Sequence, residues 1–178
     1  QAELKRKEMI IDTHTHLDGS EFKDDIQEVV QRAKSAGVSK VFIPAIDLSS
    51  IKSINTVCQQ FPDFAYPMMG LHPEEVKANY KEVLQKMKNE LLANSKYIAV
   101  GEVGLDFYWS REFEKEQLEA FEEQVKWSVE TRLPLMIHCR KAQNEMVKIL
   151  RKYQKQLPGG VFHCFTGNEK EAAELLSF

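Results

Sequence analysis

The stretch that decides the fold is Met9-Ile10-Ile11-Asp12-Thr13-His14-Thr15-His16-Leu17-Asp18. It begins with an apolar, isoleucine-rich run, which is typical of a buried β-strand. Side chains along a strand point alternately to opposite faces, so His14 and His16 are expected to share one face. Two imidazoles at the end of a strand can bind the same metal ion, because imidazole is the commonest metal ligand among side chains. Two surface histidines are the alternative interpretation, and the rest of the sequence has to decide.

The composition is that of an ordinary globular protein, with 43% hydrophobic and 29% charged residues among 178. One domain is expected at this length, over residues 9–178, with residues 1–8 as a polar lead-in. The net charge of −3 gives no overall basic surface for duplex DNA or a membrane. A nucleic-acid substrate stays possible, because bound metal ions and a few arginines can supply the positive field.

Strand-like and helix-like segments alternate along the sequence. After the first strand, short apolar runs predict strands at residues 41–46, 64–70, 97–103, 135–138 and 160–163. Apolar residues at helical spacing predict helices at residues 23–36, 49–61, 79–93, 112–130 and 142–155, and a last helix after an N-cap at Asn168. Six strand–helix units indicate a parallel sheet with helical crossovers, as an open doubly wound sheet or a closed barrel.

The positions of the histidines favour the barrel. An open sheet of this class usually carries a glycine-rich phosphate loop after its first strand, where this sequence has His-Thr-His. All five histidines of the sequence fall at the C-terminal ends of predicted strands, where barrel enzymes keep their active sites. The predicted fold is therefore an α/β, (β/α)8 TIM-type barrel, of which this chain supplies about six βα units.

The same strand ends supply a carboxylate, Glu102. A carboxylate among several imidazoles is typical of hydrolytic sites in which a metal-activated water attacks a phosphorus or carbonyl centre. We expect Glu102 to bridge two divalent ions, each held by a pair of histidines. The two pairs are His14 with His16, and His138 with His163. Zinc, manganese, nickel and magnesium all stay open as the identity of the ions.

Further residues near the strand ends have competing interpretations. Arg140 is expected to hold a phosphate or carboxylate, with a solvated arginine as the alternative. His72 is expected to contact the substrate or support a ligand before binding metal itself. Asp106 is expected to orient an imidazole or a water, with a surface turn carboxylate as the alternative. The aromatic pair Tyr108 and Trp109 would either stack on bases or cover the end of the barrel.

The three cysteines, Cys58, Cys139 and Cys164, form no CxxC motif and no even disulfide framework. Unpaired cysteines indicate a reducing compartment, so a cytoplasmic location is expected. Cys139 and Cys164 each directly follow a histidine of the cluster. Strand alternation should turn both toward the helices, where a free cysteine packs as a small apolar residue and is not a metal ligand.

Five motifs resemble, in the same order, those of the TatD family of metal-dependent hydrolases, within the amidohydrolase-like barrels. They lie at residues 11–18, 70–73, 101–106, 137–140 and 162–167. The resemblance implies the ligand set named above, with the two histidine pairs on separate ions and Glu102 between them. It also implies a deoxyribonuclease that cleaves phosphodiester bonds, typically from a 3′ end of single-stranded DNA. Some similar proteins instead remove D-amino acids from tRNA.

One motif of that family is absent from the sequence. Similar proteins end with a further aspartate ligand in a Thr-Asp-Ser-Pro-like motif, and this sequence stops at Phe178 before it. We therefore expect a longer protein whose C-terminal part is missing here. The alternatives to a nuclease are a D-aminoacyl-tRNA deacylase, another ester or amide hydrolase with the same site, and a truncated binding module without catalysis.

Overall fold

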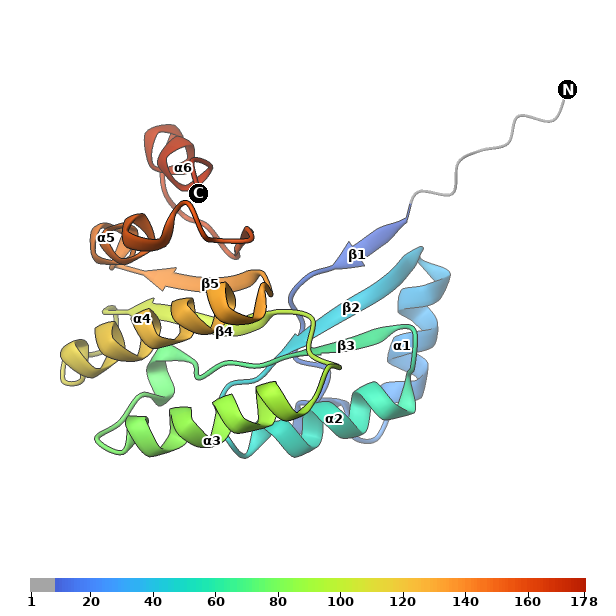
Figure 1. Ribbon diagram of the computed structural model, residues 1–178. Helices are drawn as coiled ribbons and strands as arrows, with labels where there is room; N and C mark the ends of the chain where they lie inside the picture. Colours follow the sequence, from blue (N-terminus) through green and yellow to red (C-terminus); the bar gives the residue numbers. More distant parts are fainter. Residues whose placement is uncertain (1–8) are drawn as a thin grey trace, which may run out of the picture.

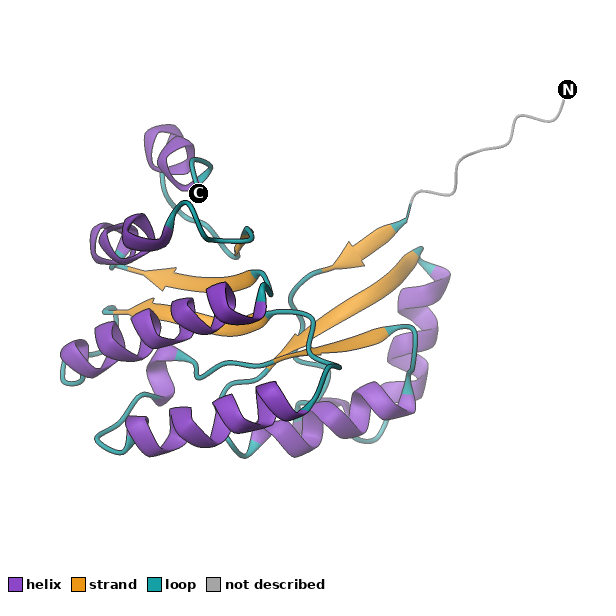
Figure 2. Ribbon diagram, viewed as in Figure 1, coloured by secondary structure: helices purple, strands orange, loops and turns teal. Residues whose placement is uncertain are grey.

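The computed structural model describes residues 9–178, so the predicted polar lead-in at residues 1–8 lies outside the described part. Strands and helices alternate from one end of this part to the other (Figure 1, Figure 2). The strands are β1 (Ile10–Asp12), β2 (Val38–Pro44), β3 (Ala65–Met68), β4 (Val100–Asp106), β5 (Leu135–Arg140) and β6 (Gly160–Phe162). The helices are α1 (Ile26–Ser35), α2 (Ser50–Gln60), α3 (Tyr80–Ala93), α4 (Glu114–Thr131), α5 (Gln143–Tyr153) and α6 (Glu169–Leu175), with 3₁₀ turns η1 (Ser20–Phe22) and η2 (Pro73–Glu75).

The strands form two parallel three-stranded sheets, β1-β2-β3 and β4-β5-β6. The two sheets meet at a single parallel bridge between Met69 and Val100, so the six strands follow one another in chain order. Helices α2, α3 and α4 run along one side of the strands (Figure 1). The predicted α/β fold with parallel strands is thus confirmed. Within residues 9–178, β6 is not paired with β1, and closure into an eight-stranded barrel stays a prediction.

Local sequence signals account for the helix ends. Gly37 follows α1 with a φ of 97°, the left-handed conformation in which many helices end and which glycine adopts without strain. At α6 the side chain of Asn168 accepts hydrogen bonds from the backbone N–H groups of Lys170 and Glu171, while Glu171 accepts one from the N–H of Asn168. This reciprocal capping box is the one that the Asn168–Glu171 spacing predicts. None of the described helices is long and apolar enough to span a bilayer.

The prediction that the first strand is buried is wrong. Ile10 and Ile11 are 47% and 41% exposed. Strand β1 pairs only with β2, so its other edge is uncovered in the part of the chain that the structure describes. By contrast, all seven residues of β4, at the junction of the two sheets, are buried.

Glycine is required at one position of this junction. Gly104 in β4 has a φ of 146°, and a Cβ atom there would lie 1.8 Å from the carbonyl oxygen of His138 in β5. Only a residue without a side chain lets the two strands approach this closely beside the histidine.

We expect Gly104→Ala to destabilise the protein well beyond Gly159→Ala. Gly159 also has a positive φ, of 107°, but a Cβ atom there would meet nothing within 4 Å. Gly159→Ala should therefore lower the unfolding free energy only by the backbone strain of a positive φ, about 1–3 kcal/mol. Urea unfolding of both variants measures the difference, and equal losses of unfolding free energy would contradict the close-approach argument.

Candidate metal centre

The carboxylate of Glu102 lies at the centre of a cluster formed by all five histidines of the chain. Its side chain is only 3% exposed. Strand β4 carries it, and the peptide bond between Gly101 and Glu102 is cis. The histidines approach from four places: two from the loop after β1, and one each from η2, β5 and the turn after β6. The cluster can form because parallel strands end at the same edge.

One oxygen of the carboxylate, Oε2, faces the two histidines that follow β1. The Nε2 atoms of His14 and His16 lie 3.3 and 3.8 Å from it, and 3.1 Å from each other. These residues lie in the loop beyond β1, so the loop and not strand alternation brings them together. The side chain of Asp12 accepts a hydrogen bond from the N–H of His14, and Thr15 N–H donates to the carbonyl of Phe42 in β2, which fixes the loop.

The other oxygen, Oε1, faces the histidines of β5 and of the turn after β6. His138 Nδ1 lies 3.2 Å and His163 Nε2 lies 2.7 Å from it. The opposite nitrogen of His138, Nε2, contacts Oδ2 of Asp106 at 2.8 Å, and this carboxylate is buried. The ring of His163 stacks on that of His14, with centroids 3.9 Å apart. The two histidine pairs are therefore packed against each other as well as against Glu102.

His72 reaches the same oxygen in a different role. It caps η2, where its Nδ1 accepts a hydrogen bond from the N–H of Glu74, so the proton of the neutral ring is on Nε2. Its Nε2 lies 3.3 Å from Oε1 of Glu102 and can donate to it. A protonated nitrogen cannot bind a metal ion, which agrees with a supporting role for His72.

Charge in the cluster is set by competition between burial and hydrogen bonding. Burial raises the pKa of Glu102, but hydrogen bonds from His138, His14, His163 and His72 outweigh it and hold that pKa well below its usual range. Burial lowers the pKa of His138, yet its contacts with Glu102 and Asp106 raise that pKa overall. Burial, followed by the charge of His14, lowers the pKa of His16.

The donor atoms fit metal ions. Four ligands about 2.0–2.1 Å from a tetrahedral ion lie about 3.3 Å from one another. The separations among His14, His16 and Glu102, at 3.1, 3.3 and 3.8 Å, are close to this value. Glu102, His138 and His163 form a second such group, and the carboxylate is common to both. A third grouping, His72 with Glu74 and His138, fits less well because His72 Nδ1 already accepts a hydrogen bond.

Three other residues for which the sequence made a prediction lie outside the ligand groups around Glu102. Arg140 does not contact Glu102; it is exposed at the end of β5, with its guanidinium over the ring of Tyr108. Cys139 is half-buried against the core, as expected, and burial raises the pKa of its thiol to about 11. Cys164, however, is exposed, and the prediction that it packs inward is wrong. Strand β6 ends at Phe162, so Cys164 sits in a turn with a φ of 50°, where alternation no longer applies.

Two buried glutamines of α4 support the site, and the sequence analysis missed both. The side chain of Gln124 pairs with both backbone groups of Leu71, beside His72, at 2.7 and 3.2 Å. Gln117, two helical turns earlier, pairs in the same way with the backbone of Asp106, at 2.9 and 3.1 Å. The available signal was their spacing of seven residues, which puts two amides on one helix face.

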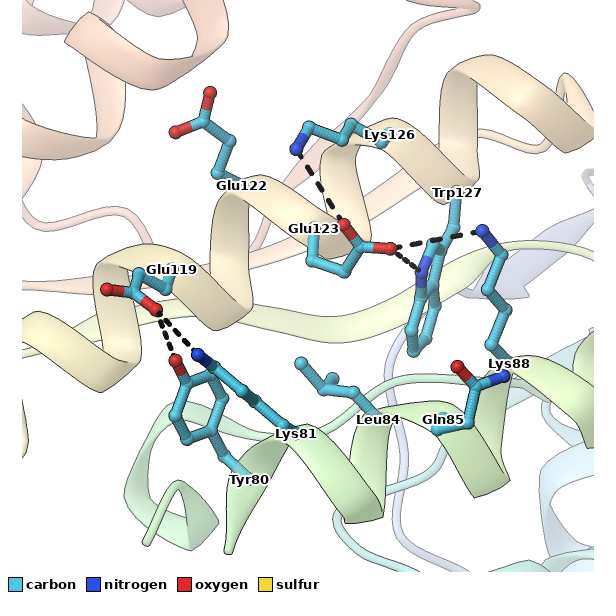
Figure 3. Close-up of a pocket in the computed structure, with 10 residues that line it drawn as sticks. All are labelled: Tyr80, Lys81, Leu84, Gln85, Lys88, Glu119, Glu122, Glu123, Lys126 and Trp127. Carbon is cyan, nitrogen blue, oxygen red and sulfur yellow. Dashed lines mark hydrogen bonds and ion pairs between the residues drawn. The ribbon is translucent and has the colours of Figure 1, made fainter. Parts of the chain in front are cut away.

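A groove between α3 and α4 is a cavity of a different kind (Figure 3). Its floor contains Leu84, and two of its three glutamates pair with lysines, a tyrosine and a tryptophan that also line the groove. Glu119 contacts Tyr80 and Lys81, while Glu123 contacts Lys88, Lys126 and Trp127. Because these charges neutralise one another and the groove holds no histidine, it is not the candidate site.

The fold and the cluster together define a class: α/β proteins that bind metal with histidines and a carboxylate at the C-terminal ends of parallel strands. The sequence model of the family described as TatD related DNase matches residues 11–178. The chain therefore belongs to this family, which confirms the resemblance given by the five motifs.

Individual relatives support this family assignment. The chain is 34% identical over 168 residues to the "Uncharacterized metal-dependent hydrolase YabD" of Bacillus subtilis, covering 94% of this chain and 65% of that protein. It is 31% identical to the "3'-5' ssDNA/RNA exonuclease TatD" of Pectobacterium carotovorum, covering 94% and 64%. The crystal structure of YJJV, a TatD homologue from Escherichia coli, matches with a TM-score of 0.84 and 30% identity, over 94% of this chain and 64% of that one. The chain thus spans about two thirds or slightly less of the length of these relatives.

The hydrogen bonds of Gln124 predict that its replacement lowers the stability of the protein. Gln124→Leu leaves the buried N–H and C=O of Leu71 without partners, so unfolding free energy should fall by about 2–4 kcal/mol. Gln85→Leu, at an exposed position of α3, is the matched control and should change it by no more than about 0.5 kcal/mol. Denaturant unfolding measures both, and similar small effects would show that the amide pair contributes little.

Proposed function

We propose that the protein is a metal-dependent phosphodiesterase that acts on single-stranded nucleic acid, and DNA in particular, from a 3′ end. The observation that carries this proposal is the buried Glu102 carboxylate, shared by two separate groups of imidazole nitrogens. A shared carboxylate between two ligand groups is the arrangement of a two-metal hydrolytic site. The name of the Pectobacterium relative supports the substrate class and the polarity, and it favours a nuclease over a deacylase.

In this proposal the ligands are divided between two divalent ions. His14 and His16 would hold one ion, His138 and His163 would hold the other, and Glu102 would contribute to both. Such ions, when bound, supply activated water at neutral pH and stabilise the charge that develops on the departing oxygens. The ions' identity stays open among zinc, manganese, nickel and magnesium, although the imidazole-rich set favours the first three over magnesium.

The remaining residues of the site act on the ligands and the substrate. His72 donates its Nε2 proton to Oε1 of Glu102 and so fixes the plane of the carboxylate. Asp106 holds Nε2 of His138, which leaves Nδ1 of that ring directed at Glu102. Arg140 presents its guanidinium to a phosphate at the mouth of the site. We also propose that the six strands belong to a closed (β/α)8 barrel and that the three free cysteines reflect a cytoplasmic location.

The test is degradation of a 5′-labelled single-stranded oligonucleotide by the full-length protein, with metal content measured on the same samples. We expect stepwise shortening from the 3′ end that a chelator abolishes and added metal restores. Glu102→Gln should lose metal and lower the rate by more than about 100-fold, because both ligand groups lose their common oxygen donor. Full metal content and activity in this variant would overturn the proposal.

Cys139→Ser is the matched control for that experiment. Cys139 lies directly after His138, but it packs against the core and belongs to neither ligand group. Its replacement should leave metal content and the cleavage rate unchanged. Loss of an ion in Cys139→Ser would show that the ligand assignment around His138 is wrong.

Asp106→Asn tests how His138 is oriented. An amide NH₂ facing Nε2 of His138 would move the ring proton to Nδ1, the nitrogen that points at Glu102. Metal affinity should then fall about 10- to 100-fold. Metal titration followed by calorimetry measures this loss, and ¹⁵N NMR of the ring reports the proton's position. Unchanged affinity with the proton still on Nε2 would contradict the assigned role of Asp106.

A further inference from the structure

An aromatic cluster at the end of β4 and β5 is not used by the metal centre itself. It consists of Tyr108, Trp109 and Arg140, here called the aromatic platform. Tyr108 and Trp109 are 47% and 69% exposed, and their rings meet edge to face with centroids 4.7 Å apart. Within residues 9–178 the indole is 69% exposed and covers little of the core that the structure describes.

The guanidinium of Arg140 lies over this pair. Its Cζ atom is 3.5 Å from the ring centroid of Tyr108 and 5.4 Å from that of Trp109. Among the described residues its guanidinium has no hydrogen bond and no ion pair, whereas the nearby Arg111 is held by two hydrogen bonds from its guanidinium to Glu114. Contact with the two rings positions the guanidinium of Arg140, while its N–H groups have no partner among the described residues and can bind a phosphate bidentately.

The platform is tied directly to the metal centre. The carboxylate of Asp106 accepts a hydrogen bond from Tyr108 N–H at Oδ1, at 2.9 Å, while its Oδ2 contacts His138 Nε2. Arg140 follows His138 by two residues on β5, so the two side chains project from the same face about 7 Å apart. Trp109 and Asp106 also line one small cavity, together with Pro73 and Lys77. The platform is therefore linked to Glu102 through Asp106 and His138.

We propose that the aromatic platform binds the unpaired 3′-terminal nucleotide of the substrate, with its base on Trp109 and an adjacent phosphate on Arg140. This inference rests on the proposed function and names the subsite that selects a single strand. A base within a duplex is already stacked on both faces, whereas an unpaired base offers a free π-face to an aromatic ring. Stacking does not read hydrogen-bond edges, so the subsite tolerates all four bases and both DNA and RNA.

The test compares two substrates on the full-length, metal-loaded protein: a single-stranded oligonucleotide, and the same oligonucleotide with an abasic 3′-terminal residue. Trp109→Ala should raise KM for the intact oligonucleotide roughly 5- to 150-fold, with a smaller change in kcat, and leave the abasic substrate unaffected. Trp109→Phe keeps a stacking ring and should recover most of the loss. A role confined to folding would affect both substrates equally.

Tryptophan fluorescence gives a second readout that needs no cleavage. Trp109 is exposed and Trp127 is 1% exposed, so stacked bases can quench only the first. In chelator, a non-cleavable single strand should quench emission in wild type and in Trp127→Phe, but not in Trp109→Phe. Arg140→Ala should weaken the binding measured in this way, and Arg140→Lys should restore it only in part, because a lysine cannot bind bidentately.

The outcomes separate the two proposals. Quenching by the oligonucleotide without hydrolysis in any metal would overturn the proposed function and support the platform. Hydrolysis with a KM that is indifferent to Trp109→Ala would overturn the platform and support the proposed function. In Trp109→Ala, equal increases in KM for the intact and abasic substrates would also overturn the platform proposal, because the base would then make no contribution to binding.

Discussion

The buried charge of Glu102 is the constraint on which the rest of the structure depends. Placing a carboxylate in a protein interior costs several kcal/mol unless partners compensate for the lost water. Here the partners are imidazoles that arrive from β5, from η2 and from the loops after β1 and β6. The carboxylate can be compensated only if all these strand ends meet at one edge. Parallel strands with helical crossovers satisfy that requirement, because every crossover brings the next strand back in the same direction.

Helix α4 supports the site through side-chain hydrogen bonds to the backbone, in addition to ordinary core packing. An apolar helix face would bury the backbone groups of Leu71 and Asp106 without partners, at a cost of about 1–3 kcal/mol for each group. Gln117 and Gln124 instead extend the hydrogen bonding of the sheet into the helix layer. Strand alignment behind His72 and Asp106 is thereby coupled to the packing of one helix, which also carries the buried Phe121 and Trp127.

Much of this arrangement could be predicted from sequence because its signals are local. Apolar periodicity placed each helix within a few residues, Asn168 marked the start of the last helix, and the histidines marked the strand ends that meet at Glu102. The predictions failed where the exposure or the partner of a residue depends on contacts with distant parts of the chain. Exposure of β1 depends on which strands flank it, and the exposure of Cys164 depends on β6 ending two residues earlier. The amide pairs of α4 join residues 11 and 53 positions apart, and no local pattern reveals such partners.

Asp106 connects the two functions proposed for this edge. Its two oxygens serve different groups, one the ring of His138 and the other the backbone of Tyr108. Since Gln117 fixes the backbone of the same residue, neither oxygen can move without disturbing the other contact. A base stacked on Trp109 would therefore contact a loop that is held by Asp106, the same residue that contacts Nε2 of His138. Substrate binding and metal binding should then be thermodynamically linked through this carboxylate, and the linkage must be reciprocal.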